Sequence, residues 1–490
     1  MPRRVRGRDR ISPFRALGRR QENQPHGWSP QISALEMPTL NIVGDADSSI
    51  LEQSGELFRL LGGGVLNRAA ETRAAAGVKS ARSGQRMPLL SEGGLSEERL
   101  ERLHEVMAGY VERGVAPGIV TLVSRGSDED VAVVGMTAVG GDEPMKRDTI
   151  FRIASMSKPI TAVAAMILVE ECKLRLDDPV DELLPELANR QVLRSLESEL
   201  DDTVPANRPI TLRDLLTFRL GIGLVFGPEP YPIQQAMAEQ LVGFVPNAQA
   251  VPEPDEWMRR LGSLPLIRQP GEAWLYGTGS NVLSVLIARA ADQSLSDFMR
   301  ERLFEPLGMK DTGFSVPADK IDRLPTSYGT NFATGELTLF DDPAKSNWSS
   351  PPAFESGAGG LVSTVDDLHA FGQMMLNKGT YGDVRSLSRP TVELMTTDQL
   401  TPEQKAIPGL TPGFWEDHGW GFGVAINTKR TQIYASPGRF GWFGGYGTSW
   451  YVDPAEGVIG ILLTQAAFTS ADPPTIERDF WTGAYQAIEG

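Results

Sequence analysis

The chain has 490 residues, of which 41% are hydrophobic and 22% are charged, which is ordinary for a globular protein and excludes a disordered chain. A net charge of −16 disfavours nucleic acid as the main partner, and no apolar run approaches the ~18 residues of a membrane-spanning helix, so no membrane partner is expected. Cys172 is the only cysteine, so no intrachain disulfide can form, and we expect it to pack at the end of an apolar helix. Four histidines lack metal-ligand spacing, and we expect neither a metal nor an organic cofactor.

The first 94 residues divide into three parts by composition. Residues 1–27 are rich in arginine, and no apolar stretch of ~7–15 residues follows them, so we predict a basic tail rather than a secretory signal, and a cytoplasmic protein. Residues 28–66 predict a strand and a helix and resemble a late strand–acid–helix piece of α/β-hydrolases, with Asp47 in the place of the triad acid. Because serine and histidine partners for Asp47 are missing, we interpret this part as an appendage without catalytic function, with docking or oligomerisation as the alternative. Residues 67–94 predict a flexible linker.

Residues 95–490 form one predicted domain, which begins with a helix and a hairpin. Ser96 is placed to cap an amphipathic helix over residues 99–114. Residues 118–134 then predict a β-hairpin, with a polar turn over residues 126–130.

A serine and a lysine follow at the start of an apolar helix. Ser155-Met156-Ser157-Lys158 is the only S-x-x-K among the ten lysines, and Pro159 fits a helix only within its first turn. Residues 160–170 are apolar and helix-compatible, so Ser155 is placed at or just before the N-terminus of a buried helix. Lys158 lies about one turn later on the same face, and the helix dipole adds positive potential where an oxyanion would form. This pattern indicates an activated nucleophile; the alternative is a serine cap beside an exposed lysine.

At these residues the chain resembles the serine β-lactamase-like hydrolases, most closely the class C β-lactamases and the related family VIII carboxylesterases. The resemblance runs from about residue 95 to the C-terminus and is carried by segments in family order, namely residues 149–161, 176–180, 210–217, 305–309 and 359–364. It implies the α+β fold of the β-lactamases and penicillin-binding proteins, in which helices flank an antiparallel sheet and a mainly helical lobe is inserted. No G-x-S-x-G motif is present, which disfavours an intact α/β-hydrolase.

Tyr276 stands where this family places its catalytic tyrosine, after the sequence Pro270-Gly271-Glu272-Ala273-Trp274-Leu275. A nearby Lys158 ammonium would lower the pKa of the phenol, so Tyr276 could act as a base toward the alcohol or the deacylating water. The chain departs from the Y-x-N pattern of class C enzymes, because Thr278 stands where asparagine is needed and Asn281 has a different spacing. The alternative for Tyr276 is an interfacial aromatic residue.

The segment Trp442-Phe443-Gly444 stands where β-lactamases usually carry K-T-G, and similar W-x-G forms occur in the esterase branch. The resemblance implies that these three residues bind substrate and that the backbone N–H groups of Ser155 and Gly445 form an oxyanion hole. Trp442 offers an aromatic wall and one N–H donor without a charge, so we expect neutral acyl esters to be preferred over anionic substrates. The alternative is a glycine-rich turn between strands.

Three further tryptophans, Trp274, Trp415 and Trp420, either extend an apolar acyl pocket or pack in the core. Strands return near the C-terminus, over residues 448–452 and 458–464. We therefore expect one antiparallel sheet from both ends of the domain, about residues 95–160 and 380–490, with a helical lobe over about 161–379. The cleft between lobe and sheet is the expected site.

The sequence predicts a serine carboxylesterase that cleaves short-chain acyl esters through an acyl-enzyme on Ser155, with Lys158 and Tyr276 as the base. The expected partner is a small-molecule ester, and weak β-lactamase activity is an expected side reaction. A β-lactamase or D-Ala-D-Ala peptidase-type hydrolase and an acyltransferase remain alternatives. Outside enzyme chemistry, a ligand-binding or sensor protein on the same fold also remains.

Overall fold

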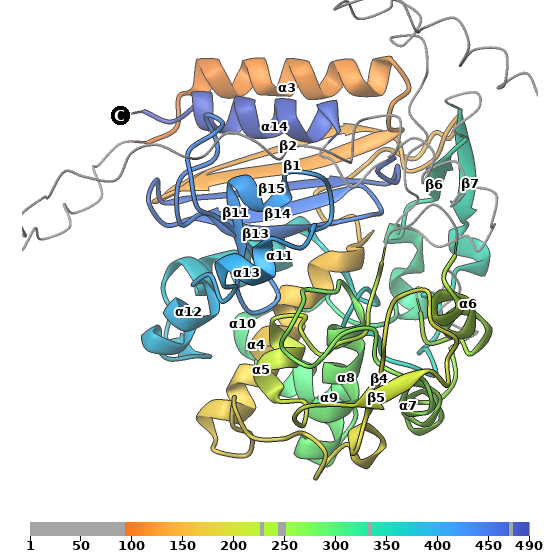
Figure 1. The fold of residues 1–490 in the computed structure, drawn as a ribbon. Helices are drawn as coiled ribbons and strands as arrows, with labels where there is room; N and C mark the ends of the chain where they lie inside the picture. The colour runs from red at the N-terminus through yellow and green to blue at the C-terminus, as the bar shows by residue number, and fades with distance from the viewer. Residues whose placement is uncertain (1–93, 226–229, 244–250, 332–335, 470–473, 490) are drawn as a thin grey trace, which may run out of the picture. The chain divides into compact units, whose positions relative to one another are not determined.

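A computed structural model describes residues 94–225, 230–243, 251–331, 336–469 and 474–489 (Figure 1). The basic tail, the fragment that contains Asp47 and nearly all of the linker lie outside the described residues. In the described part of the chain, no helix is both long and apolar enough to cross a membrane.

A seven-stranded antiparallel sheet is built from the two ends of the described chain. Its strands, in sheet order, are β11 (His418–Trp420), β12 (Ala425–Asn427), β13 (Phe440–Gly444), β14 (Thr448–Asp453), β15 (Val458–Thr464), β1 (Gly118–Arg125) and β2 (Asp128–Gly135). The two ends meet where β15 pairs with β1, with Ile119 opposite Thr464 and Arg125 opposite Val458. Every residue of β1, β13, β14 and β15 is buried, because helices cover both faces of the central strands.

One face of the sheet is covered by the first and last helices, α3 (Glu97–Glu112) and α14 (Thr475–Gln486), which lie together in Figure 1. The buried residues of α3 are Leu100, Leu103, Met107 and Tyr110, whose spacing puts them on one stripe of the helix. Helix α11 (Val365–Leu376) packs against β1, β14 and β15. Although α11 falls within the range predicted as the helical lobe, its apolar side covers the sheet.

The hairpin of β1 and β2 is tighter than the sequence predicts. Only Gly126 and Ser127 form its turn, and Gly126 has a φ of +61°, which favours glycine. The predicted polar turn over residues 126–130 is therefore wrong, because Asp128, Glu129 and Asp130 belong to β2. Charged side chains are tolerated there since β2 is the edge strand of the sheet.

The remaining elements form the mainly helical part and its short ladders. The helices are α4 (Ser157–Glu170), α5 (Leu212–Leu216), α6 (Pro232–Glu239), α7 (Pro254–Ser263), α8 (Thr278–Ala291), α9 (Leu295–Met299), α10 (Glu305–Leu307), α12 (Arg389–Met395) and α13 (Pro402–Lys405). The ladders pair β3 (Phe151–Arg152) with β8 (Val362–Ser363), β4 (Gln191–Leu193) with β5 (Thr203–Pro205), β6 (Ser327–Thr330) with β7 (Leu337–Asp341), and β9 (Thr380–Tyr381) with β10 (Val384–Arg385). The sheet from both chain ends and the helices between them confirm the predicted fold class.

Cys172 is exposed, so its expected packing at the end of the apolar helix is wrong. The chain leaves α4 through a left-handed residue, Cys172 itself, with a φ of +59°. The Cys172 N–H donates to Val169 O at 3.0 Å and the Lys173 N–H to Leu168 O at 3.0 Å, which completes a helix C-cap. This cap turns the cysteine side chain away from the core.

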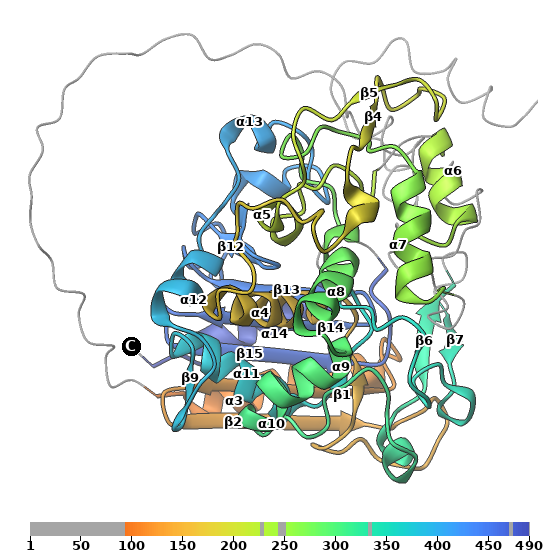
Figure 2. The same ribbon diagram turned by 90° about the horizontal axis from the view of Figure 1, so that it is seen from below.

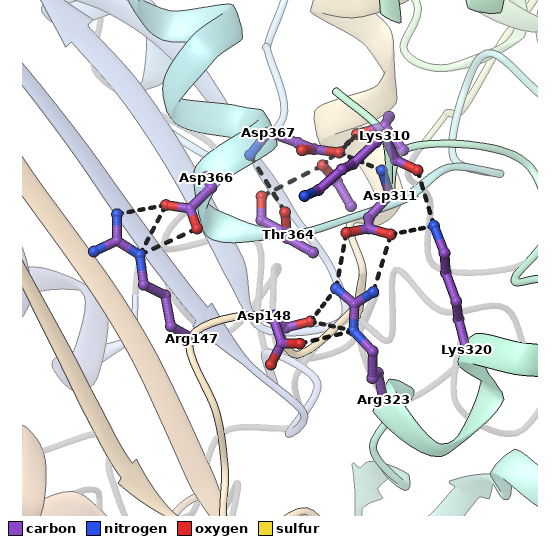
Figure 3. A network of polar contacts seen from close by, with 11 residues as sticks. Arg147, Asp148, Lys310, Asp311, Lys320, Arg323, Thr364, Asp366 and Asp367 are labelled. Carbon is purple, nitrogen blue, oxygen red and sulfur yellow. Dashed lines mark hydrogen bonds and ion pairs between the residues drawn. The ribbon is translucent and has the colours of Figure 1, made fainter. Parts of the chain in front are cut away.

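A charged network anchors the segment that enters β3 (Figure 3). Asp311 is almost fully buried and accepts from the Arg323 guanidinium at 2.8 and 3.0 Å and from Lys320 Nζ at 2.7 Å. Arg323 also donates to the Asp148 carbonyl at 2.6 Å, and the Ile150 N–H donates to Arg323 O at 2.9 Å. Because several hydrogen bonds join Asp311, Arg323 and the backbone at Asp148 and Ile150, the network fixes the path of the chain just before β3 and Ser155.

Candidate active site

Ser155 lies in a single 3₁₀ turn, Ala154–Met156, that leads directly from β3 into α4. Ala154 has a φ of +44°, a left-handed conformation that is strained for a residue with a Cβ. The Ser157 hydroxyl holds this conformation by donating to Ala154 O at 2.7 Å. Ser155 is thus placed at the N-terminus of a buried helix, as the sequence predicts.

Lys158 lies in the first turn of α4 and is completely buried. Its Nζ atom is 2.9 Å from Ser155 Oγ and 2.6 Å from the Ala358 carbonyl oxygen. Among the described residues no carboxylate forms an ion pair with it, and burial lowers the pKa of Lys158 to about 7. A large fraction of neutral amine is therefore present near neutral pH, and this amine can accept the Ser155 proton.

Tyr276 immediately precedes Gly277, whose φ of +97° opens α8. The Tyr276 hydroxyl is hydrogen-bonded to the Ser155 side chain and accepts from Trp442 Nε1 at 2.7 Å. Lys158 Nζ lies 4.6 Å from the centre of its ring. The structure therefore brings Ser155, Lys158, Tyr276 and Trp442 together, as expected from the sequence.

The expected lowering of the Tyr276 pKa is wrong. Burial raises the pKa of Tyr276, and the hydrogen bonds from Ser155 and Trp442 offset this only in part. The physical reason is that the phenol is almost fully buried, so the phenolate loses its hydration. Tyr276 keeps its proton at neutral pH, whereas Lys158 is partly unprotonated there.

The segment around Gly444 lies against the turn that carries Ser155. A Cβ on Gly444 would overlap the Ile153 carbonyl oxygen, so only glycine fits at this approach. The Gly444 carbonyl, which shares a peptide unit with the Gly445 N–H, accepts from the Gly447 N–H at 3.0 Å, and this bond fixes the orientation of the peptide. Within the described residues, no hydrogen bond is found to the backbone N–H of Ser155 or of Gly445. Two free amides at adjacent segments are what an oxyanion hole requires.

The tryptophans around Tyr276 pack as a core. The ring centres of Trp274 and Trp420 lie 5.6 and 6.4 Å from that of Tyr276, and both side chains are buried. Phe443 is also buried and contacts Trp442 at 4.7 Å between ring centres, whereas Trp415 is half-buried and donates to Ile407 O at 3.0 Å. The core-packing alternative therefore describes Trp274 and Trp420.

A family model described as Beta-lactamase matches residues 103–479 of the chain. The chain belongs to the beta-lactamase family. As a member with a serine beside a buried lysine, it is a serine hydrolase of the β-lactamase fold.

Relatives of this beta-lactamase family member include one protein whose name states no activity and one that is described as an esterase. Protein Rv1367c of Mycobacterium tuberculosis is 39% identical over 360 residues, which cover 72% of this chain and 87% of the relative. Esterase EstB of Burkholderia gladioli is 29% identical over 360 residues, which cover 68% of this chain and 81% of EstB. The solved structure of EstCE1, described as a hydrolase with promiscuous acyltransferase activity, has a TM-score of 0.65 and 23% identity and covers 79% of this chain and 99% of EstCE1. This last likeness shows the fold.

Sequence reasoning missed one part of the site of this beta-lactamase family member, the Ala358 carbonyl that contacts Lys158. A backbone carbonyl has no signature in the sequence, and the resemblance covers residues 359–364, which begin just after Ala358. Asn281 Oδ1 accepts from Ser356 Oγ at 2.7 Å. Among the residues that the structure describes, no cluster of three or more His, Cys, Asp or Glu side chains could hold a metal ion.

Proposed function

We propose that this chain is a carboxylesterase that cleaves neutral, short-chain acyl esters through an acyl-enzyme on Ser155. The observation that carries the proposal is the buried Lys158 amine, 2.9 Å from Ser155 Oγ and without a carboxylate partner in the described residues. A neutral amine at this distance can remove the hydroxyl proton as Oγ attacks an ester carbonyl.

The reaction we propose has two halves. In the first, the Oγ–carbon bond forms, the proton passes to Lys158, and the N–H groups of Ser155 and Gly445 bind the oxyanion. The intermediate then expels the alcohol, which takes the Tyr276 proton while Lys158 returns its own proton to Tyr276. In the second half a water attacks the acyl carbon and gives a proton to Lys158. The Oγ–carbon bond then breaks, Lys158 returns this proton to Ser155 Oγ, and the carboxylic acid leaves.

The preference for neutral esters rests on Trp442. The indole donates to Tyr276 at 2.7 Å and carries no charge, so it offers an anionic substrate no ion pair at the place where β-lactamases usually carry a lysine. The esterase description of EstB, the relative at 29% identity, supports the same reading. We propose that β-lactam cleavage is at most a weak side reaction.

The test is to assay the purified protein with p-nitrophenyl butyrate and with nitrocefin, and to repeat both assays with Ser155→Ala. We expect butyrate to be cleaved much faster than nitrocefin and the Ser155→Ala rate to fall by roughly 10³-fold or more, because the nucleophile is lost. Dominant nitrocefin turnover would make the protein a β-lactamase, and ester turnover that survives in Ser155→Ala would reject the mechanism.

Three further points, namely acyl transfer, a reaction without a metal and the cytoplasmic location, remain predictions to be tested beside this assay. Adding an alcohol acceptor tests acyl transfer, since a new ester would form in place of the free acid from the same acyl-enzyme. A rate that is unchanged in EDTA would support a reaction without a metal, and cell fractionation would test the cytoplasmic location.

A further inference from the structure

The segment that holds Lys158 in place runs between two helices. Figure 2 shows α4 and α8 side by side, and these helices pack closely along their lengths. Residues 356–361 are hydrogen-bonded to the N-terminal half of each helix, close to Ser155 on one side and Tyr276 on the other. This segment therefore contacts both helices that present the catalytic groups.

Gly357 is fixed by one hydroxyl from each helix. Thr161 Oγ1 of α4 lies 2.9 Å from the Gly357 carbonyl oxygen and 3.0 Å from the Ser157 carbonyl oxygen of its own helix, so its one proton is shared between these two acceptors. The Gly357 N–H donates to Ser284 Oγ of α8 at 2.8 Å. All three residues are buried, so both polar groups of the Gly357 peptide units depend on these hydroxyls for their hydrogen bonds.

The space around Gly357 has no room for a side chain. A Cβ at this position would lie 2.6 Å from Thr161 Oγ1 and 2.8 Å from Ser284 Oγ, closer than packed atoms approach each other. A larger residue would have to push the two hydroxyls, and with them the two helices, apart. The gap between α4 and α8 is thus matched to the width of a bare backbone.

The next residue of the segment reaches the catalytic lysine. The Ala358 carbonyl accepts from Lys158 Nζ at 2.6 Å, and three residues further along the chain the Leu361 N–H donates to Ser157 Oγ at 3.2 Å. When the amine is neutral, one of its N–H groups is directed to Ala358 and its lone pair is left to face the Ser155 hydroxyl.

We propose that Gly357 is a spacer between α4 and α8, clamped by the Thr161 and Ser284 hydroxyls. These two hydrogen bonds, called the clamp, place the Ala358 carbonyl beside Lys158. The carbonyl in turn sets the direction of the lone pair on Lys158 Nζ that takes the Ser155 proton. Gly357, Thr161 and Ser284 are positioning residues, because none of them contacts the reacting atoms. The inference rests on the proposed function in one respect, namely that Lys158 is the base.

The decisive variant is Thr161→Val, which replaces the hydroxyl by a methyl group of similar size. We expect kcat for p-nitrophenyl butyrate to fall roughly 10- to 100-fold with KM changed less than about threefold, because the base is misplaced while the substrate still binds. We also expect the acid limb of the pH profile to move to lower pH, since an amine that loses its carbonyl acceptor is less stabilised as ammonium. Thr161→Ser should restore most of the activity.

Thr396→Val is the matched control, because the Thr396 hydroxyl donates only within its own helix, to Val392 O at 2.9 Å. It should leave kcat and the pH profile unchanged. A folded Thr161→Val enzyme with wild-type kcat and an unmoved acid limb would overturn the proposal. Gly357→Ala, if it folds, should lose activity in the same way, and full activity in the folded variant would also overturn it.

The labelling rate of Ser155 by a fluorophosphonate probe separates this proposal from the proposed function. The probe needs an activated serine but no ester substrate. If the wild-type protein is labelled at Ser155 but cleaves no ester, the substrate proposal fails and the clamp is judged on labelling alone. The clamp is supported if Thr161→Val is labelled at least about tenfold more slowly than both the wild type and Thr396→Val. It is rejected if the three proteins are labelled at equal rates.

Discussion

At the scale of single residues, burial decides which group holds a proton. Lys158 and Tyr276 lie within the same small volume, and loss of hydration acts on them in opposite directions. The ammonium is disfavoured, so the pKa of Lys158 falls to about 7, and the phenolate is disfavoured, so the pKa of Tyr276 rises. Burial alone, without any neighbouring charge, therefore supports the roles we propose, with Lys158 as the base and Tyr276 as a proton donor.

The first prediction concerns the pH dependence of ester cleavage. Because Lys158 must be neutral to act and its pKa is about 7, kcat/KM should fall about tenfold per pH unit below pH 7 and level off above it. A pH-rate profile of the free enzyme between pH 5 and 9 measures this inflection. A rate that stays constant down to pH 5 would mean that another group is the base.

The second prediction concerns the hydrogen bond from Trp442 to Tyr276. Trp442→Phe keeps an aromatic ring but removes the N–H that donates to the Tyr276 oxygen at 2.7 Å, so we expect kcat to fall roughly tenfold, about 1.4 kcal/mol. Trp481→Phe is the control, because the Trp481 N–H donates to Ser449 Oγ, away from Ser155, at 3.1 Å. Steady-state kinetics of both folded variants should show the loss only in Trp442→Phe.

At the scale of elements, the strands and helices with a clear apolar pattern could be predicted, and the exceptions have physical causes. The strand predicted over residues 458–464 has the bounds of β15, because it is apolar throughout and flanked by turns. The turn of the first hairpin is predicted too long, because the acidic residues Asp128 to Asp130 resemble a turn unless it is known that they lie on the edge strand of the sheet. Ser155 and Lys158 could be predicted because one helical turn joins them, whereas the contact of Lys158 with Ala358 spans 200 residues of chain.

The third prediction concerns α14, which carries a buried carboxyl group. Glu477 accepts from Ser449 Oγ at 2.7 Å, and burial raises its pKa to about 7. The folded protein therefore binds this proton more tightly than the unfolded chain, and stability is lost as pH rises from about 4.5 through 7. Glu477→Gln removes that loss, so its free energy of unfolding at pH 8 should exceed that of the wild type by about 1–3 kcal/mol, with little difference at pH 5.

Urea unfolding at both pH values measures this difference. Glu98→Gln, a change of a carboxylate that is 86% exposed, should show no such pH dependence. Arg439, which also interacts with Glu477, has further partners that Glu477→Gln keeps, because its guanidinium carbon lies 3.9 and 4.2 Å from the ring centres of Tyr451 and Trp481. A Glu477→Gln protein less stable than the wild type at pH 8 would show that the carboxylate is ionised and stabilising.

At the scale of the described chain, the site is assembled from segments far apart in sequence. Ser155 and Lys158 come from the start of the domain, Tyr276 and Ala358 from its helical part, and Trp442 from the C-terminal strands. Their meeting depends on β15 pairing with β1, which joins residues about 340 positions apart. The sequence could predict the members of the site through resemblance and local pattern, but not the contacts among them, because such contacts exist only once the sheet has closed.

The last prediction is that a chain beginning at Gly94 folds and acts like the full protein. The described part closes on itself at this point, since the Ser96 N–H donates to Ala487 O at 2.8 Å and the Glu489 N–H donates to Gly94 O at 3.0 Å. Within the described residues, the hydrogen bonds of the Ser155, Lys158 and Tyr276 side chains that join them to one another, to Ala358 and to Trp442 all lie beyond Gly94. We therefore expect kcat/KM for p-nitrophenyl butyrate within about twofold of the full chain and a Tm within about 2 °C, because the contacts within the described site and sheet are kept. A large loss of activity with an unchanged Tm would show instead that the first 93 residues act on the reaction itself.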